Sequence, residues 1–308
     1  METKTEAVNT TVRVGPIRMA NPIMTASGTF GSGREYAQFF DLGALGAVVA
    51  KTVTLHPRPG NPPPRVCETQ GGMLNSIGLQ NEGIEHFLRE EMPFLRTLPV
   101  PVLASIAGHA LDEYVRLAER LAGTGLAGIE LNLSCPNVEG GRLFCGDPDR
   151  AYQLVEKVRR STTLPLVAKL GPESASIMED VARACEAAGA DALSLVNTFP
   201  AMSLDVRRRR SRLGTMTGGL SGPAIKPIAI RMVWEISRIV KIPIIGMGGI
   251  MTAEDALEFI LAGATAIAVG TASFANPLAI PEIIEGIKSF LNEEGIQSLD
   301  ELRGRLNI

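Results

Sequence analysis

One cysteine lies where its thiol could take part in catalysis. Cys135 is part of the segment ELNLSCPN (130–137), just after an apolar run and between Asn132 and Asn137. The stretch VEGGRLFCGD follows, so the pattern predicts an exposed glycine-rich loop rather than a core position. A thiolate can act as a base or a nucleophile, and both roles require access to a substrate. We therefore expect Cys135 to be a catalytic residue.

The other three cysteines are weaker candidates. Cys145 shares the glycine-rich stretch and remains a rival, whereas Cys185 lies in a helical pattern and, like Cys67, is typical of an inert small apolar residue. The sequence has no CxxC pair and no companion histidine at metal-ligand spacing. We expect no structural zinc, no iron–sulfur cluster on this chain, no disulfide framework and no metal site.

Two lysines end otherwise apolar runs, Lys51 in AVVAK and Lys169 in PLVAK. Such a lysine can neutralise a carboxylate, a phosphate or a reduced flavin, although an ordinary lysine would extend its charge into solvent. A Schiff-base role is also open, because burial favours the nucleophilic amine. Two lysines near a reactive cysteine fit flavin chemistry better.

Two glycine-rich turns could bind an anion. GMGGI (246–250) and AVGTAS (268–273) each follow an apolar run and precede a helical pattern. Glycine lets backbone N–H groups approach a phosphate closely near a helix start. Either turn alone could be merely structural, and a phosphate site would suit many lyases and isomerases as well as flavin mononucleotide enzymes.

Short apolar runs and helical patterns alternate along the chain and must position these residues. The runs predict eight strands, at 22–26, 46–51, 101–106, 127–133, 164–170, 190–196, 242–247 and 264–270. Apolar residues at three- and four-residue spacing predict helices at 111–122, 148–160, 175–188, 223–240, 253–262 and 280–292, with weaker patterns at 34–42 and 83–95.

This alternation favours an α/β fold, a (β/α)8 barrel of the TIM type. An open doubly wound sheet usually carries GxGxxG after its first strand, and that spacing is absent here. Barrel enzymes place their chemistry at the carboxyl ends of the strands. The residues expected there are Ser27, Lys51, Thr52, Ser105, Asn132, Cys135, Lys169, Asn197, Thr198, Gly248, Gly249, Gly270 and Thr271.

Three further segments belong to the predicted barrel, which we interpret as a single domain over residues 1–308. A small hairpin at 12–19 could plug the barrel floor, and the long βα loops 52–82 and 197–222 could cover the active site. The basic stretch VRRRRSRLG (206–214) is typical of a solvated loop, with partner docking as the minor interpretation.

Composition excludes several classes of partner. The 308 residues are 45% hydrophobic but only 5% aromatic, which suits buried parallel strands. A formal net charge of -3 gives no global attraction for nucleic acid or an anionic membrane. No apolar run reaches the roughly 18 residues of a membrane helix, so we expect a cytoplasmic protein.

Several motifs together resemble the class 1 dihydroorotate dehydrogenases. The match runs in order from about Thr11 to about Phe290, and NSIGLQN with NLSCPN is its most specific pair; NSIGLQN resembles the NAD-linked branch. The motifs are ASGTFG (26–31), KT (51–52), GNPPPR (60–65), NSIGLQN (75–81), NLSCPN (132–137), NT (197–198), GGLSG (218–222), MGGI (247–250) and VGTA (269–272).

The resemblance implies oxidation of dihydroorotate to orotate in pyrimidine (UMP) biosynthesis, with flavin mononucleotide (FMN) at the barrel mouth. Cys135 would remove the proton while hydride passes to the flavin. Substrate-binding residues would be Lys51, Asn75, Ser76, Ile77, Gly78, Leu79, Asn132, Asn197 and Thr198. Flavin-binding residues would be Ser27, Lys51, Thr52, Ser105, Asn132, Lys169, Val196, Gly222, Gly248, Gly249, Gly270 and Thr271.

The resemblance also implies a partner. The chain has neither a dinucleotide-binding fingerprint nor a cysteine cluster, so it lacks a route of its own from flavin to NAD. The NAD-linked branch implies a second subunit with FAD and a [2Fe-2S] cluster, joined to a homodimer of this chain in a heterotetramer. A fumarate-linked enzyme, a dihydropyrimidine dehydrogenase-like barrel and a phosphate-binding aldolase or isomerase barrel remain alternatives.

Overall fold

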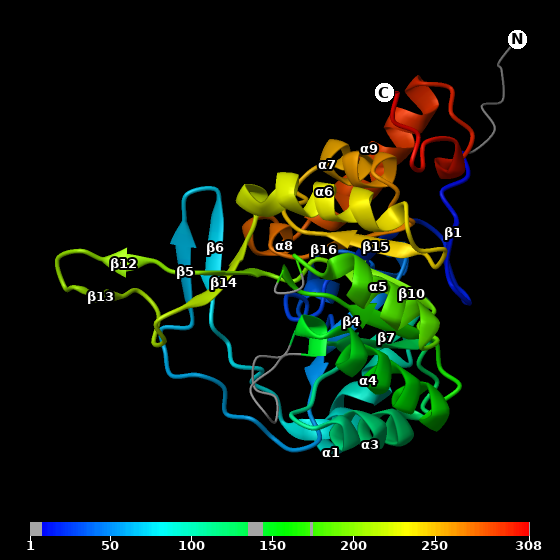
Figure 1. Cartoon of the computed structure of the whole chain (residues 1–308). Coiled ribbons are helices and arrows are strands. Elements are labelled where there is room, and N and C mark those ends of the chain that lie inside the picture. The colour runs from blue at the N-terminus through cyan, green and yellow to red at the C-terminus, as the bar shows by residue number, and fades with distance from the viewer. Residues whose placement is uncertain (1–7, 135–143, 173–174, 308) are drawn as a thin grey trace, which may run out of the picture.

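Eight short parallel strands form the centre of the protein in the computed structural model, which describes residues 8–134, 144–172 and 175–307 (Figure 1). Most of their side chains are small or branched aliphatics, buried as expected when helices cover a parallel sheet. The strands are β3 Ile23–Thr25, β4 Val48–Val53, β7 Val102–Ile106, β8 Gly128–Asn132, β9 Leu166–Lys169, β10 Ala192–Leu195, β15 Ile244–Met247 and β16 Ala266–Val269. Each overlaps a predicted run, which confirms the predicted strands.

The sheet closes into a barrel between its first and last strands. The order is β3-β16-β15-β10-β9-β8-β7-β4. A parallel bridge between Met24 and Ala47 joins the two edges. The buried Thr25 hydroxyl completes the seam: it accepts from the Val49 N–H at 2.8 Å and donates to the Val49 carbonyl at 3.2 Å. This closure confirms the predicted (β/α)8 fold.

Helices surround the strands, and all six strong helix predictions are confirmed. An Asp147 side chain caps α4, and a reciprocal Thr252–Asp255 capping box starts α7, satisfying N–H groups that a helix start leaves free. The helices are α3 Leu111–Leu121, α4 Pro148–Ser161, α5 Met178–Ala187, α6 Lys226–Ser237, α7 Ala253–Leu261 and α9 Ala279–Glu293, with a short α8 at Ala272–Ala275.

The two weaker helix predictions had different outcomes. The segment 83–95 is helical, as α1 Gly83–His86, a π-helical turn η3 Phe87–Glu91 and α2 Met92–Leu95. The helix predicted at 34–42 is wrong. That segment forms two separate 3₁₀ turns, because Asp41 is extended and its side chain accepts from the Gly43 N–H, starting a new turn. The 3₁₀ turns of the described chain are η1 Tyr36–Gln38, η2 Leu42–Ala44, η4 Phe144–Gly146, η6 Pro223–Ile225 and η7 Leu299–Glu301.

A hairpin closes the amino-terminal end of the barrel, as predicted. Strands β1 Val12–Val14 and β2 Ile17–Met19 pair antiparallel around a turn at Gly15. The Ile17 side chain lies against Gly128 at the start of β8, and Met19 lies against Gly46 just before β4. We call residues 12–19 the floor hairpin.

The two long loops pair with each other in a way that the sequence did not predict. They form an antiparallel sheet in the order β11-β14-β6-β5. Figure 1 shows a second, two-stranded hairpin of β12 and β13 extending away from the barrel beyond this sheet. The strands are β5 Val66–Thr69, β6 Gly72–Asn75, β11 Phe199–Ala201, β12 Leu204–Asp205, β13 Arg210–Ser211 and β14 Gly218–Ser221. No helix in the described ranges is long and apolar enough to cross a membrane.

Candidate active site at the barrel mouth

The carboxyl ends of the eight barrel strands, with the segments that follow them, form what we call the barrel mouth. Every barrel strand contributes a predicted site residue there, because parallel strands all end on the same side. The described residues are Ser27 after β3, Lys51 and Thr52 in β4, Ser105 in β7, Asn132 in β8, Lys169 in β9, Val196, Asn197 and Thr198 after β10, Gly248 and Gly249 after β15, and Gly270 and Thr271 after β16.

Lys169 belongs to a buried polar cluster at this end of the barrel. Its Nζ donates to Ser27 Oγ at 3.0 Å, and that hydroxyl donates to Glu130 Oε1 at 2.7 Å. The same Glu130 oxygen lies 3.9 Å from Lys169 Nζ. The other carboxylate oxygen accepts a longer bond from Ser194 Oγ at 3.4 Å. The lysine therefore has a carboxylate partner beside it inside the barrel.

A chain of hydrogen bonds links the ends of β8 and β10. Asn197 Nδ2 donates to Ser134 Oγ, which donates to Asn132 Oδ1 at 2.9 Å. The Asn197 side-chain oxygen Oδ1 accepts from the Thr198 N–H at 2.9 Å. Tyr114 of α3 also anchors this strand end, because its hydroxyl donates to the Asn132 carbonyl at 2.7 Å. Two of the predicted amide side chains are thus fixed in place before any ligand binds.

The antiparallel sheet brings Asn75 to the same region. Its Nδ2 donates to the Gly219 carbonyl at 3.2 Å across the β6–β14 pair. Thr198 Oγ1 lies so close to Gly219 that a Cβ there would stand 2.0 Å from it, so only glycine fits. Asn75 and Thr198, which are 123 positions apart in the chain numbering, therefore adjoin the same residue.

The segment 76–79 continues from Asn75 with an unusual backbone. Gly78 has φ +73° and a Cβ there would meet the Asn61 backbone nitrogen at 2.6 Å. Leu79 is also left-handed at φ 54°, a conformation that costs energy for a residue with a side chain. Ser76 Oγ accepts from Asn61 Nδ2 at 2.8 Å. Ser76, Ile77, Gly78 and Leu79 are all partly exposed, so they can contact a ligand.

Lys51 has a different environment from Lys169. It is partly exposed in β4, and no ion pair joins it to a carboxylate among the residues that the structure describes. Burial lowers the pKa of Lys51, and the positive charge of Arg65 lowers it further. Lys51 and Arg65 form no ion pair with the carboxylates of the described ranges, so together they create a local attraction for an anionic ligand.

Thr52 and Ser105 form a buried pair on the neighbouring strands β4 and β7. Their hydroxyl oxygens are 2.9 Å apart and share one hydrogen bond. Ser105 has no exposed surface and Thr52 has 6%. Thr52 is the member of the pair nearer to solvent, and Ser105 orients its hydroxyl.

The glycine turns after β15 and β16 leave backbone N–H groups open to an anionic ligand. Gly248 and Gly249 have φ values of +123° and +77°, and a Cβ on Gly249 would lie 2.7 Å from the Gly222 carbonyl. The turn after β15 and the segment at Gly222 therefore meet with little side-chain bulk between them. Within the described chain, the N–H groups of Gly249, Ile250 and Thr271 donate to no protein acceptor. Free amides at the starts of helices are the donors that bind phosphate. Val196, buried beside them, donates its N–H to the Met247 carbonyl at 3.2 Å.

The cysteines differ in their exposure to solvent, although Cys135 itself lies outside the described residues. Ser134, which precedes it in the chain, is held at the mouth by the hydrogen bonds described above. Cys145 and Cys185 have no exposed surface, and burial raises the pKa of Cys185 to about 12. Cys67 is partly exposed in β5. Cys145 therefore lacks the access that a catalytic thiol needs.

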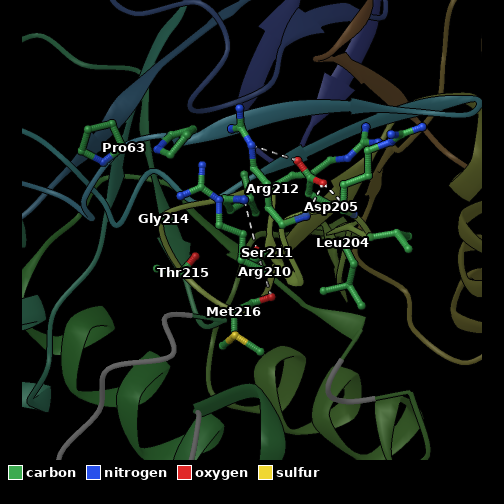
Figure 2. A pocket seen from close by; sticks show the side chains of 14 residues that line it. Pro63, Leu204, Asp205, Arg210, Ser211, Arg212, Gly214, Thr215 and Met216 are labelled. Carbon is green, nitrogen blue, oxygen red and sulfur yellow. Dashed lines mark hydrogen bonds and ion pairs between the residues drawn. The ribbon is translucent and has the colours of Figure 1, made fainter.

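An open hollow of about 840 Å³ lies beside the β12–β13 hairpin, and one of its lining residues, Thr215, donates its hydroxyl to Ser76 Oγ at 2.7 Å. Figure 2 shows its lining of arginines, Leu204 and Pro63. It contains no predicted site residue. Arg207 to Arg210 are exposed there, as expected for a solvated loop, with Arg208 paired to Asp205. The described ranges contain no group of three or more His, Cys, Asp or Glu side chains that could hold a metal ion.

Sequence reasoning missed four residues that shape the mouth: Asn61, Arg65, Glu130 and Ser134. A signal existed for Glu130, since a carboxylate inside an otherwise apolar strand must have a partner. Arg65 donates to the Asn61 carbonyl at 2.6 Å and to the Pro59 carbonyl at 3.0 Å, which fixes the loop before β5. No local pattern in the sequence predicted that Arg65 fixes this loop.

Comparison with known proteins agrees with the geometry. The sequence profile of the dihydroorotate dehydrogenase family matches residues 9–291. The chain is 54% identical over 297 residues to the "Dihydroorotate dehydrogenase B (NAD(+)), catalytic subunit" of Geotalea uraniireducens, covering 96% of this chain and 97% of the relative. It is similar to proteins of the same name from Desulforudis audaxviator (52% over 299 residues; 96% and 97% covered) and Thermodesulfovibrio yellowstonii (51% over 295 residues; 95% and 97% covered).

Proposed function

Because this chain belongs to the dihydroorotate dehydrogenase family, we propose that it oxidises dihydroorotate to orotate in pyrimidine biosynthesis, as the catalytic subunit of an NAD-linked enzyme. The observation that carries the proposal is the convergence at one barrel end of fixed amide side chains, two lysines and glycine turns with free amides. One cluster of buried apolar residues, with members from Val12 to Leu299, supports treating residues 1–308 as one catalytic domain.

FMN, when bound, supplies the hydride acceptor of the reaction. The amides of Gly249, Ile250 and Thr271 would hold its phosphate, with Gly222, Gly248 and Gly270 leaving room for it. Ser27, Lys51, Thr52, Asn132, Lys169 and the Val196 backbone would contact the rest of the flavin. Ser105 would act through Thr52, because Ser105 itself is fully buried.

The substrate is a ring with alternating N–H and carbonyl groups and one carboxylate. Amide side chains carry both a donor and an acceptor, so Asn75, Asn132 and Asn197, with Thr198, suit such an edge. Lys51 would pair with the carboxylate, and residues 76–79 would line the same space. Cys135 would accept the proton from the ring carbon beside the carbonyl as hydride leaves the neighbouring carbon.

Electron transfer onward would require a second protein. The relatives are named as a catalytic subunit that is NAD-linked, which supports a partner subunit. We propose that this partner carries FAD and a [2Fe-2S] cluster, and that a homodimer of this chain binds it in a heterotetramer. The proposed location is the cytoplasm, where the NAD pool would be available.

Orotate formation with different electron acceptors tests the proposal. The purified chain loaded with FMN is expected to oxidise dihydroorotate with an artificial dye, but with NAD only after its co-expressed flavoprotein is added. Fumarate is expected to be a poor acceptor in both samples. Efficient turnover with fumarate, and none with NAD even in the co-purified complex, would contradict the NAD-linked assignment while leaving dihydroorotate oxidation intact.

A further inference from the structure

Glu130 is a carboxylate in the interior of the barrel. It sits on β8 between Ile129 and Leu131, which have no exposed surface, and is itself only 2% exposed. Charged side chains are almost never fully buried unless they are paired. Glu130 and Lys169 are the only charged residues that are buried in the described chain. The described part of the fold therefore contains one interior ion pair.

The position of this pair points to the mouth rather than to the floor. Lys169 is the last residue of β9, and Ser27, which joins it to Glu130, follows β3. Ala26, next to Ser27, lies 3.4 Å from where a Cβ on Gly270 would be. Ser27, which bridges the ion pair, thus follows a residue that adjoins the glycine turn after β16.

The two lysines at the barrel mouth differ in whether a carboxylate is paired with them. Lys51 is partly exposed and has no carboxylate partner among the described residues, so solvent and ligands balance its charge. Lys169 is 5% exposed and its charge is balanced by Glu130 at 3.9 Å. In a site of low dielectric, removing one charge of such a pair leaves the other with a much larger effect on its surroundings.

We propose that the Glu130–Lys169 pair, rather than Lys169 alone, sets the electrostatic environment of the bound flavin. Glu130 partly offsets the lysine charge and so limits how strongly the site stabilises negative charge on the flavin ring. Ser27 holds the two side chains next to each other, because it is hydrogen-bonded to both. This inference rests on the proposed function, because it requires that the mouth binds FMN.

Sulfite binding measures this property without the substrate. Sulfite adds reversibly through sulfur to oxidised flavin, both bonding electrons come from sulfite, and the added negative charge is carried by the flavin ring. The visible flavin bands disappear as the adduct forms, so its dissociation constant follows from absorbance. A site with more positive charge near the ring binds sulfite more tightly.

Three variants separate the pair from the lone lysine. Glu130→Gln retains an oxygen that can accept from Ser27 but loses the charge, and is expected to bind sulfite about tenfold more tightly. Lys169→Gln is expected to bind it about tenfold more weakly. The double variant replaces the ion pair with two neutral amides, leaves no unpaired buried charge, and is expected to return to within about threefold of the original chain.

The alternative, in which Glu130 is only structural, gives a different pattern. Glu130→Gln then matches the original chain, and the double variant matches Lys169→Gln; either result overturns the inference. If a single variant fails to fold, the double variant alone still decides. Ser194→Ala, which removes the hydroxyl bonded to the second Glu130 oxygen and no hydrogen bond of Lys169, is the control and should leave sulfite binding unchanged. A chain that takes up no flavin would overturn the proposed function as well, whereas a flavin-loaded chain insensitive to Glu130 overturns this inference alone.

Discussion

The two ends of the same eight strands have opposite character. At the floor, Ile17 and Met19 pack against residues that begin β8 and precede β4, and the contacts are apolar. At the mouth, β8 and β9 end in Asn132 and Lys169, both hydrogen-bonded. Stabilising apolar contacts therefore lie at one end of the barrel and functional residues at the other. A loop at the mouth can change without disturbing the packing of the core.

The largest effect is expected at the mouth, from Cys135→Ala. Turnover should fall about 10²–10⁴-fold, because a general base is removed, whereas flavin content and melting temperature should stay the same. Steady-state assays with dihydroorotate, with flavin absorbance measured on the same sample, check this. Cys67→Ala and Cys145→Ala are the matched controls. Equal losses of turnover with Cys145→Ala in a folded, flavin-loaded sample would overturn the assignment of the base.

At the floor, Ile17→Ala should lower stability and leave turnover unchanged, which is the opposite of the result expected for Cys135→Ala. Removing a buried side chain that packs against Gly128 is expected to lower the free energy of unfolding by about 2–5 kcal/mol. Turnover per folded molecule should not change. Arg18→Ala, an exposed neighbour on the same strand, should cost less than about 0.5 kcal/mol. Urea unfolding measures both, and a loss of turnover without loss of stability would break the comparison between the two ends.

Lys51→Met should raise the KM for dihydroorotate about ten- to a hundredfold, because a charge-assisted bond to the carboxylate is lost. The pKa of Lys51 is lowered by burial and by Arg65, so its positive charge is lost at a lower pH than for an ordinary lysine. The KM of the original chain should therefore rise as pH increases through that lowered pKa, and the variant should lack the rise. Lys157→Met, on the outer face of α4, is the control. An unchanged KM profile in Lys51→Met would remove Lys51 from the substrate site.

The smallest effect is expected at Thr252, which stabilises a helix and also lies next to the proposed flavin site. Thr252 caps α7 directly after the glycine turn 248–250, accepting from the Asp255 N–H at 3.2 Å. Thr252→Ala should destabilise the protein by about 0.5–2 kcal/mol and weaken FMN binding modestly. Thr252→Ser retains the hydroxyl and should behave like the original chain. Fluorescence titration of FMN into the apoprotein, beside urea unfolding, measures both; weaker FMN binding in Thr252→Ser would show that the cap is not the cause.

Local patterns predicted most of the barrel but not the parts that depend on distant pairing. The strands and the floor hairpin follow from apolar runs and a Gly15 turn, which are properties of neighbouring residues. The pairing of β6 with β14 joins Asn75 to Gly219, and no periodicity within either loop announces it. The helical pattern at 34–42 failed for a different reason, because a short-range bond from the Gly43 N–H to the Asp41 side chain decided the local conformation.

The same distinction explains the site. Residues at strand ends could be assigned to the mouth because the barrel fixes where strands end. Glu130 and Ser134 escaped notice because their roles depend on partners from other strands, namely Ser27, Ser194 and Asn197. Whether a buried charge is paired is a property of the folded protein, and the sequence alone shows only that a partner is needed.

The most direct test of the central claim is anaerobic titration of the FMN-loaded chain with dihydroorotate while the flavin absorbance at roughly 450 nm is followed. We expect the band to bleach with one equivalent of substrate per flavin and orotate to appear in the same amount. A flavin-loaded chain whose band stays unchanged with dihydroorotate would contradict the proposed reaction. A chain that cannot be loaded with FMN at all would return the barrel to the phosphate-binding aldolase or isomerase class.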